Sequence, residues 1–213
     1  MARRRVTISF DNGPDPVVTP WVLDLLGRRG VRALFFPVGE RLLAPGAMEL
    51  MRRAAAEGHG IGNHTFSHPR PFGVLPLAQA VAEIDRTDAL LEGLTEPERM
   101  FRPSAGGGVL APGVLTQGIV DHLAATRHSL VLWSVVAGDW TGGDWVDLAV
   151  RLCAEQDHAL IVLHDIAGGG MADLDRFLDR LEGAGIAVVP DPPAECVPMR
   201  RGVVVGRLDG VVG

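Results

Sequence analysis

The amino-acid sequence predicts an α/β protein, specifically a distorted (β/α) barrel of about seven strands. Short apolar segments alternate with segments of helical length along most of the 213 residues. Strands that alternate with helices are typical of parallel βαβ units. Seven or so of these units in about 190 residues predict a small and irregular barrel. A doubly wound open sheet is the alternative architecture.

The expected elements come from the spacing of the apolar residues. Short apolar segments predict strands at residues 6–10, 32–38, 59–62, 100–102, 129–136, 159–163 and 186–189. Longer segments with an apolar face predict helices at residues 18–29, 47–57, 77–93, 112–125, 145–155 and 172–183.

Length and composition indicate one folded domain. A chain of 213 residues with 47% hydrophobic residues is long enough to bury a sizeable core. We expect a catalytic domain over residues 1–190 and a C-terminal appendage of the same domain over residues 191–213, where a Pro-rich segment interrupts the alternation. Cys153 and Cys196 are too few and too far apart for a disulfide framework, so we expect two buried thiols.

Charge and hydropathy exclude several classes of protein. The formal net charge of -6 argues against nucleic acid as a partner, because such partners require an excess of basic residues. No apolar run approaches the roughly 18 residues of a membrane span, so we expect no contact with a membrane. Residues 6–10 resemble a strand and not the apolar part of a signal peptide, which favours a cytoplasmic location.

Ionisable residues stand at the ends of four of the expected strands. They are Asp11, Arg102, Asp139 and His164. In a (β/α) barrel the carboxyl ends of the strands meet at one face, and that face carries the active site. We therefore expect these four side chains to converge.

The segment His64-Thr65-Phe66-Ser67-His68 places two histidines four residues apart. On a helical turn this spacing brings both side chains to one face, where they can share a metal ion. The spacing by itself is weak evidence, since pairs of this kind more often cap a turn or face solvent. The motifs elsewhere in the chain favour the metal interpretation.

Five motifs, in this order, resemble those of the polysaccharide deacetylase family, which is carbohydrate esterase family 4. The motifs are Ser9–Pro14, His64–His68, Phe101–Gly106, Asp139-Trp140 and Val162–Asp165. The resemblance covers about residues 5–190. It implies the expected barrel and a hydrolase that acts on carbon–nitrogen bonds other than peptide bonds.

The resemblance also implies a role for each catalytic residue. Asp11 would be the general base that takes a proton from the attacking water, and Arg102 would keep Asp11 ionised and oriented. His164 would be the general acid for the leaving amine, held by Asp139. A carboxylate beside an arginine and an imidazole beside a carboxylate are suited to these opposite roles.

Five further residues, in three roles, complete the implied site. His64, His68 and Asn12 would ligate a divalent metal, most often zinc in this family. The backbone N–H of Ala105 would help to bind the oxyanion, and Trp140 would wall the pocket for the acyl methyl group. A divalent ion polarises a carbonyl group and lowers the pKa of bound water towards about 7.

The chain departs from the family pattern at the metal site. Asn12 stands where the family has a second carboxylate, so the site loses one negative charge and metal affinity should fall. Asp15 is a conceivable substitute, although we expect it to stabilise a turn. Val136 stands where the family often has an acidic residue. Ala105 replaces an aromatic residue, and with the glycines at 106–108 this suggests a different or smaller substrate than a long glycan.

Three functions follow, in order of preference. The first is a metal-dependent hydrolase that removes an acetyl group from an N-acetylated sugar or a related small amide. The second is an enzyme of the same fold that hydrolyses cyclic or small C–N substrates without metal. The third is an inactive carbohydrate-binding protein, against which the joint presence of Asp11, Arg102, Asp139 and His164 counts.

Overall fold

The computed structural model describes residues 3–95 and 97–213. Its strands are β1 (Arg5–Asp11), β2 (Leu34–Phe36), β3 (Gly60–Asn63), β4 (Met100–Phe101), β5 (Ser129–Leu130), β6 (Val135–Val136), β7 (His158–His164), β8 (Ala187–Val188), β9 (Met199–Arg200) and β10 (Val203–Val204). Its α-helices are α1 (Val18–Arg29), α2 (Ala47–Ala56), α3 (Leu77–Leu90), α4 (Gln117–Ala125), α5 (Trp145–Ala154) and α6 (Leu174–Gly183).

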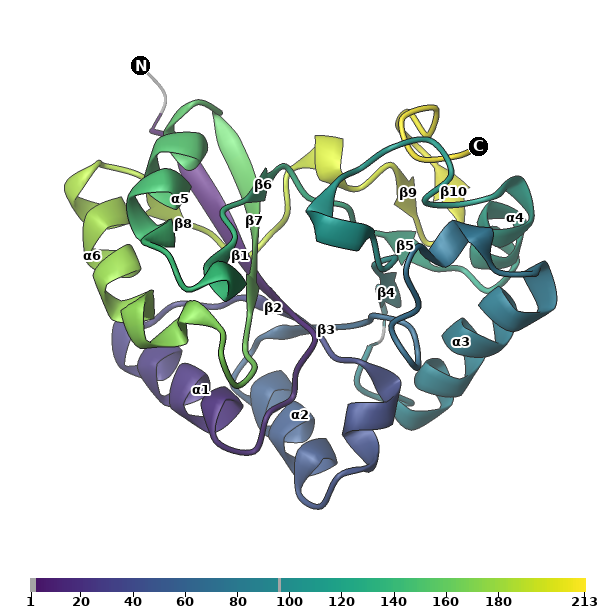
Figure 1. Ribbon diagram of the computed structural model, residues 1–213, viewed down its shortest axis with the longest axis horizontal. Coiled ribbons are helices and arrows are strands. Elements are labelled where there is room, and N and C mark those ends of the chain that lie inside the picture. The colour runs from purple at the N-terminus through teal and green to yellow at the C-terminus, as the bar shows by residue number, and fades with distance from the viewer. Residues whose placement is uncertain (1–2, 96) are drawn as a thin grey trace.

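Seven parallel strands form the curved centre of the molecule, and the helices lie around its outside (Figure 1). The order of these strands is β5-β4-β3-β2-β1-β7-β6. In the described part of the chain β5 and β6, the two ends of this series, do not pair with each other. The fold is therefore the distorted barrel expected from the sequence, not a doubly wound open sheet.

Strand β1 distributes its side chains between two environments. Val6, Ile8 and Phe10 alternate along the strand and belong to the large apolar cluster beneath the helices. Ser9 and Asp11 alternate with them and therefore face the interior of the barrel. The two-residue period of a strand thus places Asp11, the last residue of β1, at the interior and at the carboxyl edge.

The expected strand 129–136 is wrong, because two short strands replace it. Val131 still bonds to β4 through the carbonyl of Phe101. The N–H of Ser134, however, bonds to Leu160 of β7. The chain between β5 and β6 therefore crosses from one end of the parallel series to the other, and no single strand could pair with all eight residues.

The end of the chain, from β9 onward, packs onto the β5 side of the barrel, whereas Asp191 lies beside β1, where its carbonyl accepts from Thr7 Oγ1. Strand β9 pairs antiparallel with β5 and forms a hairpin with β10. Leu115 exchanges backbone hydrogen bonds with Val211 and Gly213. These bonds keep Leu115 out of a helix, so α4 begins at Gln117 and not at the expected residue 112. The boundary at residue 190 stays a prediction.

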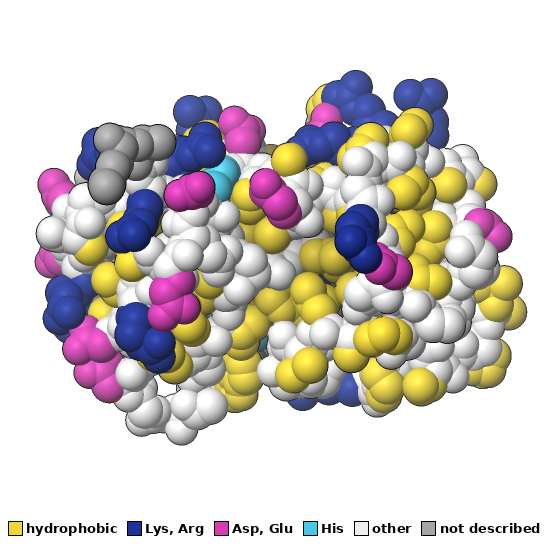
Figure 2. All heavy atoms as spheres, turned by 90° about the horizontal axis from the view of Figure 1, so that it is seen from above, with side chains coloured by type: hydrophobic (Ala, Val, Ile, Leu, Met, Phe, Trp, Pro, Cys, Tyr) yellow, Lys and Arg dark blue, Asp and Glu magenta, His cyan; other side chains and the backbone are white. Residues whose placement is uncertain are grey.

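The outer surface mixes charges of both signs. Figure 2 shows a face on which Arg side chains lie beside Asp and Glu side chains, with hydrophobic side chains between them. Both cysteines are buried free thiols, as expected. None of the described helices combines the length and the apolar character that crossing a membrane requires. The cytoplasmic location stays a prediction.

Candidate active site

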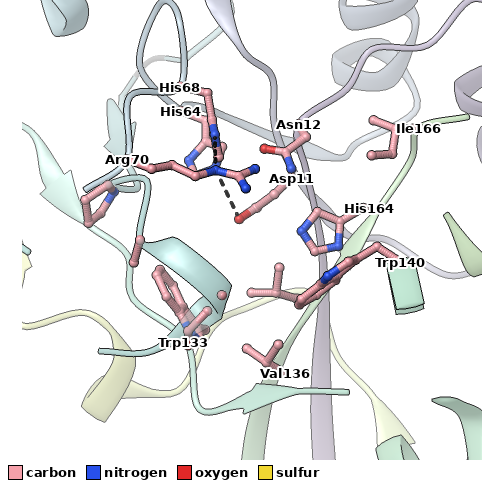
Figure 3. A pocket seen from close by; sticks show the side chains of 15 residues that line it. Asp11, Asn12, His64, His68, Arg70, Trp133, Val136, Trp140, His164 and Ile166 are labelled. Atoms are coloured by element: carbon pink, nitrogen blue, oxygen red, sulfur yellow. Dashed lines mark hydrogen bonds and ion pairs between the residues drawn. The ribbon is translucent and has the colours of Figure 1, made fainter. Parts of the chain in front are cut away.

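A cavity of about 190 Å³ lies at the carboxyl ends of the barrel strands (Figure 3). Seven of the nine residues expected in the site line it, and Arg102 and Asp139 lie behind them. The seven are Asp11, Asn12, His64, His68, Ala105, Trp140 and His164. The lining also includes Arg70, Trp133, Val136, Val162 and Ile166.

Arg102 joins Asp11 to the barrel interior. Its guanidinium Nη1 donates to Asp11 Oδ1 at 2.6 Å and to Ser9 Oγ at 2.8 Å. Burial by itself would raise the pKa of Asp11, but the charge of Arg102, with those of His64 and His164, holds the pKa below its ordinary value. Asp11 is therefore an ionised carboxylate at the edge of the cavity.

The guanidinium of Arg102 is itself completely buried, with 0% of the residue exposed. Its Nε donates to the carbonyl of Val131 at 3.3 Å, and Nη2 donates to that of Leu132 at 3.4 Å. The ring of Phe36 lies 3.9 Å below its central carbon. A buried charge is tolerated when it is paired and hydrogen-bonded in this way.

Asp139 holds His164 at two points. One carboxylate oxygen accepts from the backbone N–H of His164 at 2.8 Å, and the other pairs with the ring Nδ1 at 2.9 Å. Nδ1 therefore donates this hydrogen bond. Nε2, the other ring nitrogen, takes no part in it. Burial would lower the pKa of His164, but the hydrogen bond and charge of Asp139 outweigh it and raise the pKa.

His164 and Asp11 are neighbours in the sheet. They are register partners on the parallel strands β7 and β1, and both side chains project into the cavity (Figure 3). The Trp140 ring packs edge-on against His164, with ring centroids 4.7 Å apart. The site therefore places a carboxylate with a lowered pKa beside an imidazole with a raised pKa.

The two histidines of the second motif lie on an irregular loop and not on the expected helical turn. Thr65 and His68 have φ angles of 66° and 56°, in the left-handed region. The carboxylate of Glu83 accepts from the N–H groups of Phe66 and Ser67. These two N–H groups would bond to backbone carbonyls in a helix. The imidazoles still meet, with ring centroids 4.8 Å apart.

His64 presents a free nitrogen to the cavity. Its Nδ1 lies 2.9 Å from the carbonyl oxygen of Arg102, which can only accept, so Nδ1 carries the proton. Nε2 therefore holds a lone pair, 3.6 Å from Asp11 Oδ2. Burial lowers the pKa of His64, so the ring is neutral near pH 7. Two electron-rich groups that face each other in this way suit a cation.

Asn12 offers an oxygen to the same region. Its Oδ1 is buried and has no hydrogen-bond partner in the described part of the chain, and in Figure 3 it points towards the histidine pair. Asp15 does not replace it, because its carboxylate accepts from the N–H groups of Val17, Val18 and Ala167. The expected turn role of Asp15 is confirmed.

The donors present fit a divalent ion, although the set is weak. Two imidazoles and an amide oxygen are acceptable ligands for zinc and similar ions. Among the described residues no group of three or more His, Cys, Asp and Glu side chains is placed to hold a metal. The unpartnered oxygen of Asn12 is therefore a candidate third donor beside the two imidazoles.

Sequence reasoning missed Arg70, which follows the second motif by two residues. Its Nε donates to Nδ1 of His68 at 3.1 Å, and its guanidinium extends into the cavity (Figure 3). Burial, His64 and Arg70 together lower the pKa of His68 to about 3. Arg70 follows the irregular loop that contains Thr65 and His68, and no spacing rule indicates that loop.

Asp165 was also missed, although it belongs to the fifth motif. Burial raises the pKa of its carboxyl to about 7. Thr19 Oγ1 donates to Asp165 Oδ2 at 2.5 Å. A Cβ atom at Gly13 would lie 2.4 Å from this carboxyl, so only glycine fits beneath Asn12. Asp165 thus packs under the first motif and does not line the cavity.

The comparisons with known proteins agree with this geometry. The family model described as polysaccharide deacetylase matches residues 1–110. A chitooligosaccharide deacetylase of Sinorhizobium fredii is 36% identical over 165 residues, which are 75% of this chain and 71% of the relative. A peptidoglycan-N-acetylglucosamine deacetylase of Bacillus cereus is 29% identical over 196 residues, 89% of this chain and 68% of the relative.

Solved structures show the same fold. A family 4 acetyl xylan esterase from Clostridium thermocellum, in complex with a cobalt ion, has a TM-score of 0.70 at 26% identity, and the match covers 87% of each chain. The family model covers more than half of this chain. The two relatives named above are deacetylases, which are hydrolases of C–N bonds. The chain therefore belongs to the polysaccharide deacetylase family of hydrolases, as its five motifs indicated.

Proposed function

We propose that this protein removes the acetyl group from an N-acetylated sugar by metal-dependent hydrolysis of the amide. The observation that carries the proposal is the pair Asp11 and His164, which stand side by side in one cavity with pKa values displaced in opposite directions. Pairs of this kind divide the roles of base and acid between them.

Asp11 and His164 would carry the proton transfers. The ionised Asp11 takes a proton from the water that attacks the acetyl carbon. The protonated His164 gives a proton from Nε2 to the departing nitrogen, because amines leave poorly as anions. Asp139 fixes the ring and stabilises its positive charge, and Arg102 fixes the carboxylate.

Apolar side chains would hold the acetyl methyl group. Trp140, Val136, Val162 and Ile166 line the cavity around His164. With the acetyl group bound, they would shield the acyl side of the bond from water. The backbone N–H of Ala105 would donate to the oxygen that becomes negative during attack.

The divalent ion would be held by His64, His68 and Asn12, with zinc as the expected metal. When bound, it polarises the acetyl carbonyl and makes water easier to deprotonate. The cobalt ion in the related Clostridium thermocellum esterase supports a divalent cation in a site of this family. Asn12 lowers the affinity because it adds no negative charge.

A sugar with few units is the proposed substrate. The matched relatives are named for chitooligosaccharides and for peptidoglycan N-acetylglucosamine, so we infer an N-acetylglucosamine unit. Residues 105–108, which border the cavity, carry no side chain larger than that of Ala105. The groove therefore offers little contact surface for a long chain.

Acetate release tests the proposal. Purified protein with added zinc should release acetate from short N-acetylglucosamine oligomers, and mass spectrometry should show the matching free amines. His64→Ala should lose metal binding and nearly all activity while its circular dichroism spectrum stays unchanged. Wild-type hydrolysis by His64→Ala in the presence of a chelator would show that the metal part of the mechanism is wrong.

The pH dependence tests the acid. We expect a bell-shaped profile of kcat/KM, and His164→Ala should remove its basic limb and lower the rate roughly 10²- to 10⁴-fold. Asp139→Asn should move the basic limb to lower pH, since it removes the charge that raises the pKa of His164. Asp121→Asn, an exposed change on α4, is the control. An unchanged limb in both site variants would reassign the acid.

Asn12→Asp tests the metal hypothesis against its alternatives. A carboxylate at this position should raise zinc affinity well above that of the wild type and modestly increase deacetylation, measured by calorimetry and by acetate release. In a metal-free enzyme the same change would add a like charge beside Asp11 and reduce activity. In an inactive binding protein it would leave sugar affinity almost unchanged. A clear loss of activity would contradict our proposal.

A further inference from the structure

A hydrogen bond from Arg70 occupies one nitrogen of His68, a proposed metal ligand. Arg70 Nε–H donates to Nδ1 of His68 at 3.1 Å. A nitrogen that accepts a hydrogen bond carries no proton, so the neutral ring of His68 has its proton on Nε2. In this tautomer Nδ1 is covered by Arg70 and Nε2 has no lone pair to offer.

Neither nitrogen of His68 can therefore bind a metal while this bond exists. A metal on Nδ1 would displace Arg70 directly. A metal on Nε2 would require the proton to move to Nδ1, where it would face the N–H of Arg70. The positive charge of the guanidinium adds repulsion towards any cation in the cavity.

Arg70 is free to leave this position. Its side chain is exposed, and among residues 3–95 and 97–213 no ion pair joins it to an acidic residue. The bond to His68 is its one hydrogen bond among the same residues. A long, solvated side chain with one anchor can rotate outward once that single hydrogen bond breaks.

The loop that carries His68 does not depend on Arg70. Glu83 accepts three hydrogen bonds from Phe66 and Ser67. Asn63 Oδ1 accepts from the N–H of Thr65 at 2.8 Å. The loop is therefore held in place without the bond between Arg70 and His68.

We propose that Arg70 and a divalent cation compete for His68, so that Arg70 is a positioning residue that sets the metal affinity of the site. This inference rests on the metal site of the proposed function. The neutral side chain of Asn12 is one cause of weak metal binding, and Arg70 would be a second. Arg70 acts through the tautomer of His68 and through its own positive charge. Metal binding then requires Arg70 to swing out of the cavity.

Metal titration tests the competition. Zinc affinity is measured by competition with a chelating dye for the wild type, Arg70→Ala and Arg41→Ala. Arg41 is an exposed arginine near Asp15, so its removal changes the net charge equally without touching His68. The same three proteins are prepared in the Asn12→Asp background, which keeps binding measurable if the wild type is too weak.

Arg70→Ala should bind zinc roughly 10- to 100-fold more tightly, because a hydrogen bond to a charged group and a like-charge repulsion are both removed. Arg41→Ala should change affinity less than about threefold, since exposed charges are screened. Long-range ¹H–¹⁵N NMR of the metal-free wild type should show the His68 proton on Nε2. If zinc binds the wild type through Nε2, this proton should move to Nδ1.

The outcomes separate this inference from the proposed function. Equal zinc affinity of Arg70→Ala and Arg41→Ala in the Asn12→Asp background would overturn the competition, whether or not acetate is released. A proton on Nδ1 of His68 in the metal-free wild type would also overturn it. Tighter zinc binding by Arg70→Ala without any acetate release would support the competition and contradict the proposed deacetylation.

Discussion

The buried guanidinium of Arg102 is the constraint on which the site depends. It connects Ser9 and Asp11 of β1 to the carbonyl groups of residues 131 and 132, where the chain leaves β5 for β6. The backbone carbonyl of the same residue fixes the tautomer of His64. One residue thus joins the proposed base, one of the two proposed metal-binding histidines and the open seam of the barrel.

The cost of burying this charge explains the polar interior of the barrel. A guanidinium without partners would lose several kcal/mol of solvation, on the order of the cost of any unpaired buried ion. Ser9 and the two carbonyl groups supply acceptors, and Asp11 supplies the opposite charge. Removal of Arg102 would leave Asp11 buried and unpaired, and its pKa would rise.

The same pairing limits what the site can do with a metal. The charge of Asp11 is already shared with Arg102, and the neighbouring position holds the neutral Asn12. Arg70 adds a positive charge to the cavity. The balance of charge around the histidine pair is therefore less negative than two carboxylates would make it, and the proposed divalent cation would be held less firmly.

Much of the fold and the site follows from the sequence, because both depend on short-range patterns. The alternation of strands and helices predicted the barrel, and the ends of the strands placed Asp11 and His164 side by side. The break in strand 129–136 could not be predicted, because it depends on which distant strand each half reaches. The irregular shape of the loop that carries His64 and His68 could not be predicted either. It depends on Glu83, fifteen residues beyond His68, which accepts hydrogen bonds from backbone N–H groups of the loop. Arg70, which extends into the cavity, follows that loop.

The ionisation of Asp11 is the most direct test of the central claim that Arg102 maintains a carboxylate base in a buried site. Protein labelled with ¹³C at its aspartate carboxyl groups can be titrated by NMR, with Asp11→Asn used to assign the signal. We predict that Asp11 titrates below its ordinary pKa of 3.8 and is ionised throughout the neutral range. Titration above 3.8 would show that burial prevails over the Arg102 pair, and it would contradict this account.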